Sequence, residues 1–296
     1  MAQDILIRAQ ATAAQARVAV TLIRLLMAAL VFIACWLLTS DTRLDPNNGD
    51  PLTYVHAAAS LHEGRGLIDD INSDPSAPLS LFPPLYPILL SVAGGSIEAA
   101  RTLNAVLLWA TLLLGWLFLT VYDFPTWLRI GTLIALLFYV TDWSRMYSSA
   151  MSESLFNLLF LAWLLVMPYT ETDTGVVAYG LLSLMLSLTR YIGVPLLAIS
   201  LLWILYRRGW FAALASLALP GIGLTWWLSR NFYLVGAFTG HAAKGAYSWL
   251  SIYQLATVIA EGAALVAVFG SGAFCLSVCC AWLWRRISAS PLPADS

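Results

Sequence analysis

The sequence has little charge. Only 10% of its 296 residues are Asp, Glu, Lys or Arg, whereas 60% are hydrophobic, and the mean hydropathy is +0.79. Soluble domains carry about a quarter charged residues, so this composition excludes a water-soluble globule. The high hydrophobicity also excludes an intrinsically disordered chain. A net charge of -1 indicates no basic face for nucleic acid. We therefore predict an integral membrane protein with several transmembrane helices.

Residues that bind metals or form disulfides are also scarce. The four cysteines all lie in apolar runs, which indicates packing roles: Cys35, Cys275, Cys279 and Cys280. His56 and His62 are too far out of phase to share one face of a helix, and His241 stands alone. No nucleotide-binding or hydrolase motif occurs. We predict no cofactor and no metal site, although the sequence does not decide whether a divalent cation is required.

Eight uncharged runs are candidates to cross the membrane, since a spanning helix needs about 20 apolar residues. They are Leu25–Ser40, Thr102–Tyr122, Ile130–Thr141, Ser154–Thr170, Thr174–Thr189, Ile192–Tyr206, Gly209–Ser229 and Gly262–Trp284. The third must extend to about Phe124–Ser144 to cross. The run Pro75–Ile97 contains several prolines and a glycine pair, so we predict an interfacial or re-entrant segment there.

The predicted fold is therefore an all-α polytopic membrane domain of about eight transmembrane helices, formed by residues 1–296, with a frayed tail at 288–296. Arg8, Arg17 and Arg24 flank the first run, which is expected to be a signal anchor with a cytoplasmic N-terminus. Eight spans then place the C-terminus in the cytoplasm and residues 41–98 in a long first extracytoplasmic loop carrying interfacial helices. Arginine outnumbers lysine 14 to 1, which favours a bacterial protein of the inner membrane.

Two acidic residues are candidates for a catalytic base. Asp50 precedes Pro51 in a segment that ends at Gly64, a pattern typical of a short helix with an aspartate N-cap. Asp50 is therefore a helix cap, a general base, or both. Glu153 lies at the predicted outer start of the fourth span, where the helix dipole alone would favour an acid.

Several cations lie on the predicted outer side. Asp142 and Arg145 converge with Glu153 between the third and fourth spans. Arg190 separates two short spans, Arg230 ends the seventh, and Lys244 follows a glycine-rich loop. Arginine suits a phosphate because its planar fork forms two parallel hydrogen bonds. Each cation taken alone is also explained by snorkelling to the lipid headgroups.

Six segments of the chain resemble the GT-C membrane glycosyltransferases, which include dolichyl-phosphate-mannose–protein mannosyltransferase-like and aminoarabinose-transferase-like enzymes. The segments are Gly49–Gly64, Phe82–Pro87, Ala99–Asn104, Ser152–Phe156, Leu188–Gly193 and Trp227–Gly236. The family resemblance implies a polyprenyl-phosphate sugar donor, inverting transfer to an extracytoplasmic acceptor (a glycolipid, polysaccharide or protein) and an acidic base in the first outer loop.

By position, the resemblance implies Asp50 as the base and Glu153 as a second acid. It implies donor phosphate binding by outer-loop cations, here Arg101, Arg190, Arg230 and Lys244. We expect the substrate cavity to include Tyr54, His56, Tyr86, Asp142, Arg145 and Tyr191. Membrane lipid and the lipid-linked donor are the expected partners.

Relatives in this family are usually longer, so a partner protein that supplies the missing C-terminal part is also expected. One alternative is a non-catalytic relative that binds a lipid-linked sugar or assists a partner. A transporter or flippase is a third possibility, which would predict charges along the span centres and two symmetric halves.

Overall fold

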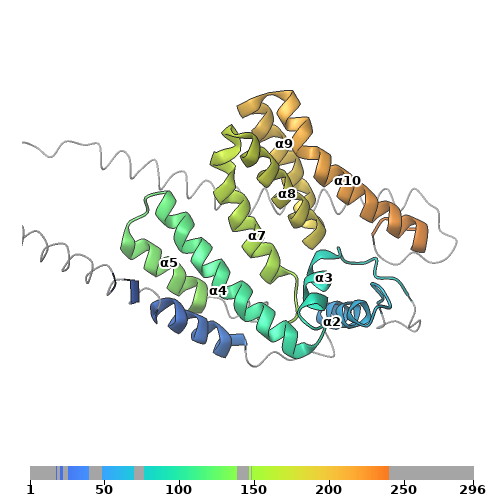
Figure 1. Ribbon diagram of the computed structural model, residues 1–296, viewed down its shortest axis with the longest axis horizontal. Coiled ribbons are helices and arrows are strands. Elements are labelled where there is room, and N and C mark those ends of the chain that lie inside the picture. The colour runs from blue at the N-terminus through green and yellow to red at the C-terminus, as the bar shows by residue number, and fades with distance from the viewer. Residues whose placement is uncertain are drawn as a thin grey trace, which may run out of the picture. The chain divides into compact units, whose positions relative to one another are not determined.

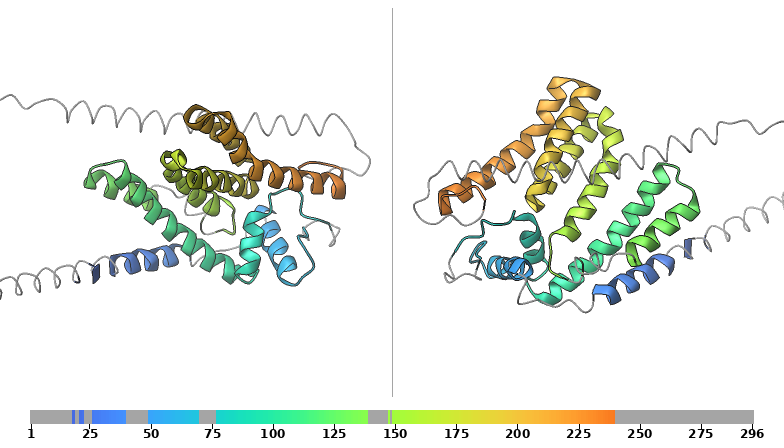
Figure 2. Two further views of the ribbon diagram at one scale, coloured as in Figure 1. Left: turned by 45° about the horizontal axis from the view of Figure 1, so that its top comes forward. Right: turned by 180° about the vertical axis from the view of Figure 1, so that it is seen from behind.

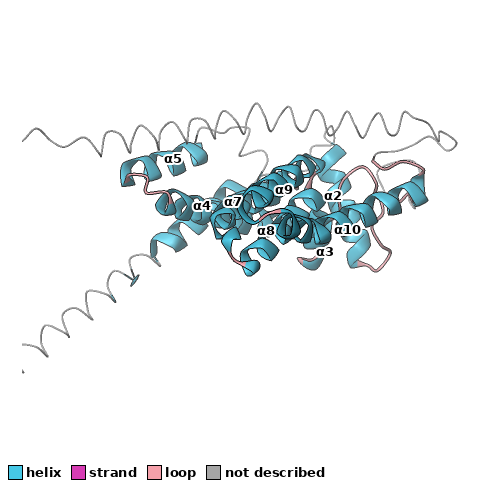
Figure 3. Ribbon diagram, turned by 90° about the horizontal axis from the view of Figure 1, so that it is seen from above, coloured by secondary structure: helices cyan, strands magenta, loops and turns pink. Residues whose placement is uncertain are grey.

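The structure is a computed structural model that describes residues 18, 21–22, 26–39, 49–69, 77–138, 147 and 149–239. Within these residues every helix or strand of more than one residue is a helix (Figure 3). The all-α prediction is therefore confirmed for the described part of the chain. Among the described residues, four helices are long and apolar enough to cross a membrane: Ile97–Val121, Glu153–Glu171, Tyr191–Arg208 and Trp210–Val235. Two further apolar helices are shorter: Leu26–Thr39 and Asp173–Thr189. These helices indicate a membrane protein.

The number of spans stays a prediction, because Gly262–Trp284 lies outside the described residues. The labelled elements are α2 (Gly49–His62), α3 (Leu85–Val92), α4 (Ile97–Val121), α5 (Thr126–Phe138), α7 (Glu153–Val166), η1 (Met167–Glu171), α8 (Asp173–Thr189), η2 (Tyr191–Gly193), α9 (Val194–Arg208) and α10 (Trp210–Val235). The chain divides into two compact units, and the prediction of a single domain over residues 1–296 stays a prediction. The first unit comprises residues 1–77 and 86–162, and the second comprises 78–85 and 163–296.

In the first unit, α4 and α5 form a hairpin that turns at Asp123, whose φ of 54° is left-handed (Figure 1). The Arg129 side chain closes this turn by donating from Nε to the Phe124 carbonyl at 2.5 Å and from Nη1 to Thr120 Oγ1 at 3.1 Å. At its other end, α4 begins five residues earlier than the predicted run, at Ile97. Arg101 therefore lies on a helix and not in a loop.

The short elements of the first unit are too small to cross a membrane. The eight residues of α3 rise only about 12 Å, against a hydrocarbon core of about 30 Å. α2 ends before Gly64, whose φ of +78° suits glycine. Its buried residues, which include Tyr54, Val55 and Ala58, lie on more than one face. α2 therefore packs into the unit, and its burial extends beyond the single apolar face expected of an interfacial helix.

The second unit is built on α8, α9 and α10, which pack against one another (Figure 1). A Cβ atom at Gly180 would lie 2.6 Å from the Ser216 carbonyl oxygen, so this glycine lets α8 approach α10 closely. Arg190 ends α8 in an extended conformation, with φ -150° and ψ 144°. α10 changes direction along its length (Figure 2), and Pro220 inside it removes one backbone donor.

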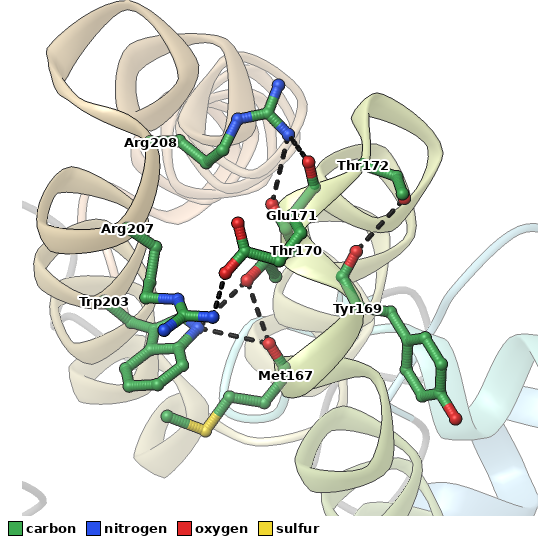
Figure 4. Close-up of polar contacts among 8 residues, drawn as sticks. All are labelled: Met167, Tyr169, Thr170, Glu171, Thr172, Trp203, Arg207 and Arg208. Carbon is green, nitrogen blue, oxygen red and sulfur yellow. Dashed lines mark hydrogen bonds and ion pairs between the residues drawn. The ribbon is translucent and has the colours of Figure 1, made fainter.

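One end of the second unit is closed by ion pairs (Figure 4). Trp203 Nε1 donates to the Met167 carbonyl at 3.2 Å and to Thr170 Oγ1 at 3.0 Å, which fixes η1 against α9. Arg207 pairs with Glu171 and lies over the Trp203 ring. Arg208 donates a hydrogen bond to the Glu171 carbonyl and forms an ion pair with Asp173. The start of α8, the end of α9 and η1 therefore share one end of the unit.

This arrangement gives a direct test of orientation. In a background without native cysteines, we expect an impermeant thiol reagent added outside the cell to label Tyr233→Cys near the end of α10. It should not label Thr174→Cys near the start of α8, because the positive-inside rule predicts a cytoplasmic position for Arg207 and Arg208. Both side chains are exposed, so access within the protein is not limiting. The reverse labelling pattern would invert the topology, and labelling of both positions would contradict a membrane span.

Candidate functional site

The first unit brings the helices of both candidate bases together. Asp50 and Tyr54 are one turn apart on α2, so they share a face. The Tyr54 hydroxyl lies 2.9 Å from Ser152 Oγ, and Ser152 immediately precedes Glu153, the first residue of α7. The face of α2 that carries Asp50 therefore lies beside the start of α7. We call Asp50, Tyr54, Tyr86, Asn104 and Glu153 the carboxylate cluster.

The helix that carries Asp50 begins two residues earlier than predicted. α2 begins at Gly49, so Asp50 lies within the first helical turn and not at the N-cap. A carboxylate in the first turn is stabilised by the helix dipole, by about 0.3–1 kcal/mol. The local structural role of Asp50 is therefore electrostatic, and a neutral isostere would lose part of it.

Asn104 is the hub of the carboxylate cluster. Its side chain is fully buried, and its Oδ1 accepts hydrogen bonds from Tyr86 OH at 3.2 Å and Ser154 Oγ at 3.0 Å. Its Nδ2 donates to the carbonyls of Tyr147 at 3.1 Å and Ser149 at 2.6 Å. These bonds use both donors and both acceptor positions of the amide. Asn104 thus ties α4 to α3, to the segment before α7 and to the first turn of α7.

Two tyrosines of the cluster form its apolar side. Tyr86 and Tyr54 meet edge to face, with ring centroids 5.2 Å apart. Burial raises the pKa of the Tyr86 phenol well above its ordinary value, and the nearby Tyr54 adds to this effect. Because a raised pKa keeps the phenol protonated, Tyr86 remains a hydrogen-bond donor to Asn104 at physiological pH.

Two further predicted residues lie in the same unit. Arg101 precedes Asn104 by one turn, so both side chains lie on α4. His56 lies on α2, where its Nδ1 and the Oγ of Ser60 are buried without a hydrogen-bond partner among the described residues. His56 and Ser60 are also one turn apart. α2 thus carries buried polar atoms on two of its faces.

The second unit contains the other described cations. Arg190 and Tyr191 join α8 to α9, and the Tyr191 hydroxyl accepts a hydrogen bond from Trp227 Nε1 at 3.1 Å. The guanidinium of Arg230 lies over the Trp227 ring, 4.7 Å from its centroid. Asn231 is fully buried and donates to the carbonyls of Ser80 at 3.3 Å and Phe238 at 3.2 Å. We call Arg190, Tyr191, Trp227, Arg230 and Asn231 the arginine cluster.

Arg230 is held by one side of its guanidinium. Nη1 donates to the Leu79 carbonyl at 2.9 Å and to Asn231 Oδ1 at 3.0 Å. Within the described part of the chain, Nε and Nη2 make no further hydrogen bond. These two nitrogens form the edge that binds a carboxylate or a phosphate with two parallel hydrogen bonds. The arrangement therefore orients an arginine while leaving its bidentate edge for an anion.

Three predicted site residues lie outside the described residues: Asp142, Arg145 and Lys244. Among the residues that are described, no three His, Cys, Asp or Glu side chains are grouped to hold a metal ion. Comparisons of the chain with protein-family models, with curated proteins and with solved structures find no match.

Sequence reasoning assigned no role to several residues that build these clusters: Asn104, Ser152, Ser154, Trp227 and Asn231. Asn104 and Asn231 could have been singled out from the sequence, because an amide inside an apolar helix is costly unless it is hydrogen-bonded. The two serines could not have been singled out, since serine is common at helix starts, where it caps the helix.

Proposed function

We propose that the protein is a membrane glycosyltransferase that moves a sugar from a polyprenyl-phosphate donor to an extracytoplasmic acceptor hydroxyl, with inversion. The observation that carries the proposal is Arg230, whose bidentate edge is available at the end of an apolar helix. A soluble sugar nucleotide would not require a cation at this place. A lipid-linked donor does require a cation there. Its lipid chain cannot leave the bilayer, so its phosphate stays at the membrane surface.

The position of Arg230 along α10 supports a lipid-borne phosphate. From Trp210 to Arg230, α10 rises about 30 Å along its axis, which equals the thickness of the hydrocarbon core. Exposed aromatic side chains lie at both ends of this stretch: Trp210 and Phe211 at one, and Trp226 and Tyr233 at the other. Tryptophan and tyrosine favour the two membrane interfaces. Arg230 then lies at the level of the lipid phosphates.

We assign the base and the phosphate-binding groups to different residues. The oxygen of the acceptor hydroxyl bonds to the anomeric carbon of the sugar. At the same time the hydroxyl gives its proton to a carboxylate, which we assign to Asp50. The bond between that carbon and the phosphate oxygen breaks, and polyprenyl phosphate leaves with one more negative charge. Arginine stabilises that charge, and we assign this role to Arg230 and Arg190. Glu153 is the second acid, and Arg101 lies on α4, the helix that carries Asn104.

The test uses the full chain in lipid nanodiscs with a radiolabelled polyprenyl-phosphate sugar. We expect binding that depends on the phosphate, so that the corresponding polyprenol does not compete, and release of polyprenyl phosphate when an acceptor is present. Phosphate-dependent binding without release under any acceptor would favour the non-catalytic alternative. Equal binding of polyprenol and polyprenyl phosphate would remove the arginine cluster from the proposal.

A further inference from the structure

We propose that Asn104 is a positioning residue that sets the orientation of the Glu153 carboxylate through the first turn of α7. The inference rests on the proposed function for its catalytic meaning, and on the hydrogen bonds of the carboxylate cluster for its geometry. Asn104 itself is fully buried, with all four of its hydrogen-bonding positions used inside the protein, so no role in contacting substrate is assigned to it.

The hydrogen bonds hold the chain on both sides of Glu153. After Glu153, Ser154 donates to Asn104 Oδ1 at 3.0 Å and also to the Met151 carbonyl at 2.9 Å. Before it, Ser152 is bonded to Tyr54 at 2.9 Å. Both serines are fully buried, whereas Glu153 is partly exposed. The backbone that carries Glu153 is therefore clamped at both neighbouring residues, and Asn104 supplies the clamp on the helical side.

Asn104 also fixes the chain that leads into α7. Its Nδ2 holds the carbonyls of Tyr147 and Ser149, and Tyr147 is itself buried. A substitution that removes the amide would leave these two carbonyls and Ser154 without their common partner. The first turn of α7 could then shift without unfolding the rest of α4. A shift of about 1 Å in a catalytic group lowers turnover by about 10²-fold.

A double-mutant cycle with Glu153 tests the assignment, because groups that act as a unit are not additive. We expect Asn104→Ala to lower kcat by about 10- to 100-fold, with the donor KM changed less than about 2-fold. In a Glu153→Gln background, the same substitution should lower kcat by less than about 2-fold. An equal loss in both backgrounds would show a general structural effect and overturn the proposal, as would full activity of Asn104→Ala.

Thr111→Val is the matched control. Thr111 is fully buried on the same helix, two turns further on, and accepts a hydrogen bond from Tyr147 at 3.4 Å. Its replacement removes a buried hydroxyl from α4 without removing any of the bonds made by Asn104. The loss of kcat in this variant should be small, and should be equal in the two Glu153 backgrounds.

A second readout does not need transferase activity. We expect carbodiimide to modify Glu153 several-fold faster in Asn104→Ala than in the wild type or in Thr111→Val, as measured by peptide mass spectrometry. Equal modification rates in all three proteins would overturn the positioning role. If the wild type shows no turnover with any acceptor, the glycosyltransferase proposal fails, and the modification rates still decide whether Asn104 holds Glu153.

Discussion

Asp50→Asn is expected to lower transferase turnover by about 10²–10⁴-fold, the range over which a positioned general base contributes. The asparagine keeps the shape of the side chain but cannot take a proton from the acceptor. Donor binding should change little, because the phosphate is assigned to arginines. The measurement is turnover with saturating donor, beside donor affinity and thermal stability on the same samples.

The structural cost of this substitution is separable from its catalytic cost. Asp50 lies in the first turn of α2, so the neutral amide loses about 0.3–1 kcal/mol of interaction with the helix dipole. Asp173→Asn is the control, since Asp173 occupies the first turn of α8 in the same way and its side chain is 93% exposed. It should lose a similar amount of stability, together with the small contribution of its exposed ion pair with Arg208, while keeping full turnover. If Asp50→Asn behaves like this control, Asp50 leaves the catalytic assignment and Glu153 becomes the candidate base.

Arg230→Ala is expected to weaken binding of polyprenyl phosphate by about 10²–10⁴-fold. Hydrogen bonds to charged groups contribute about 1.5–3 kcal/mol each, and the bidentate edge forms two of them. Arg230→Lys should lose about tenfold, because lysine retains the charge but lacks the planar fork. Affinity is measured by displacement of a labelled polyprenyl phosphate from the protein in nanodiscs.

The control for this series is Arg129→Lys. Arg129 also stacks on a tryptophan, 5.9 Å from the Trp116 centroid, and also donates to a backbone carbonyl, here of Phe124. It closes the turn between α4 and α5 and has no assigned role in binding. Donor affinity should be unchanged in this variant. An Arg230→Ala protein with wild-type affinity would make Arg230 a structural residue that holds Leu79 and Asn231 in place.

The sequence by itself determined the class of structure. Low charge and long apolar runs leave a chain no way to satisfy its backbone in lipid except as helices. The elements α8 and α9 begin and end within two residues of the predicted runs, because charged residues and glycine interrupt the apolar pattern there. α10 instead continues through Arg230 to Val235, six residues beyond the predicted end at Ser229. The single charged position at Arg190 likewise separates two short helices as expected.

Only the tertiary structure decided which residues form each cluster. The Tyr54–Ser152 contact joins residues 98 positions apart, and the Arg230–Leu79 contact joins residues 151 apart. Such pairings follow from how helices pack, and helical periodicity reports only which residues share a face of one helix. The role of Asn104 could not be predicted from the sequence for the same reason. An amide in an apolar helix is expected to be hydrogen-bonded, but the partners of Asn104 come from three other parts of the chain.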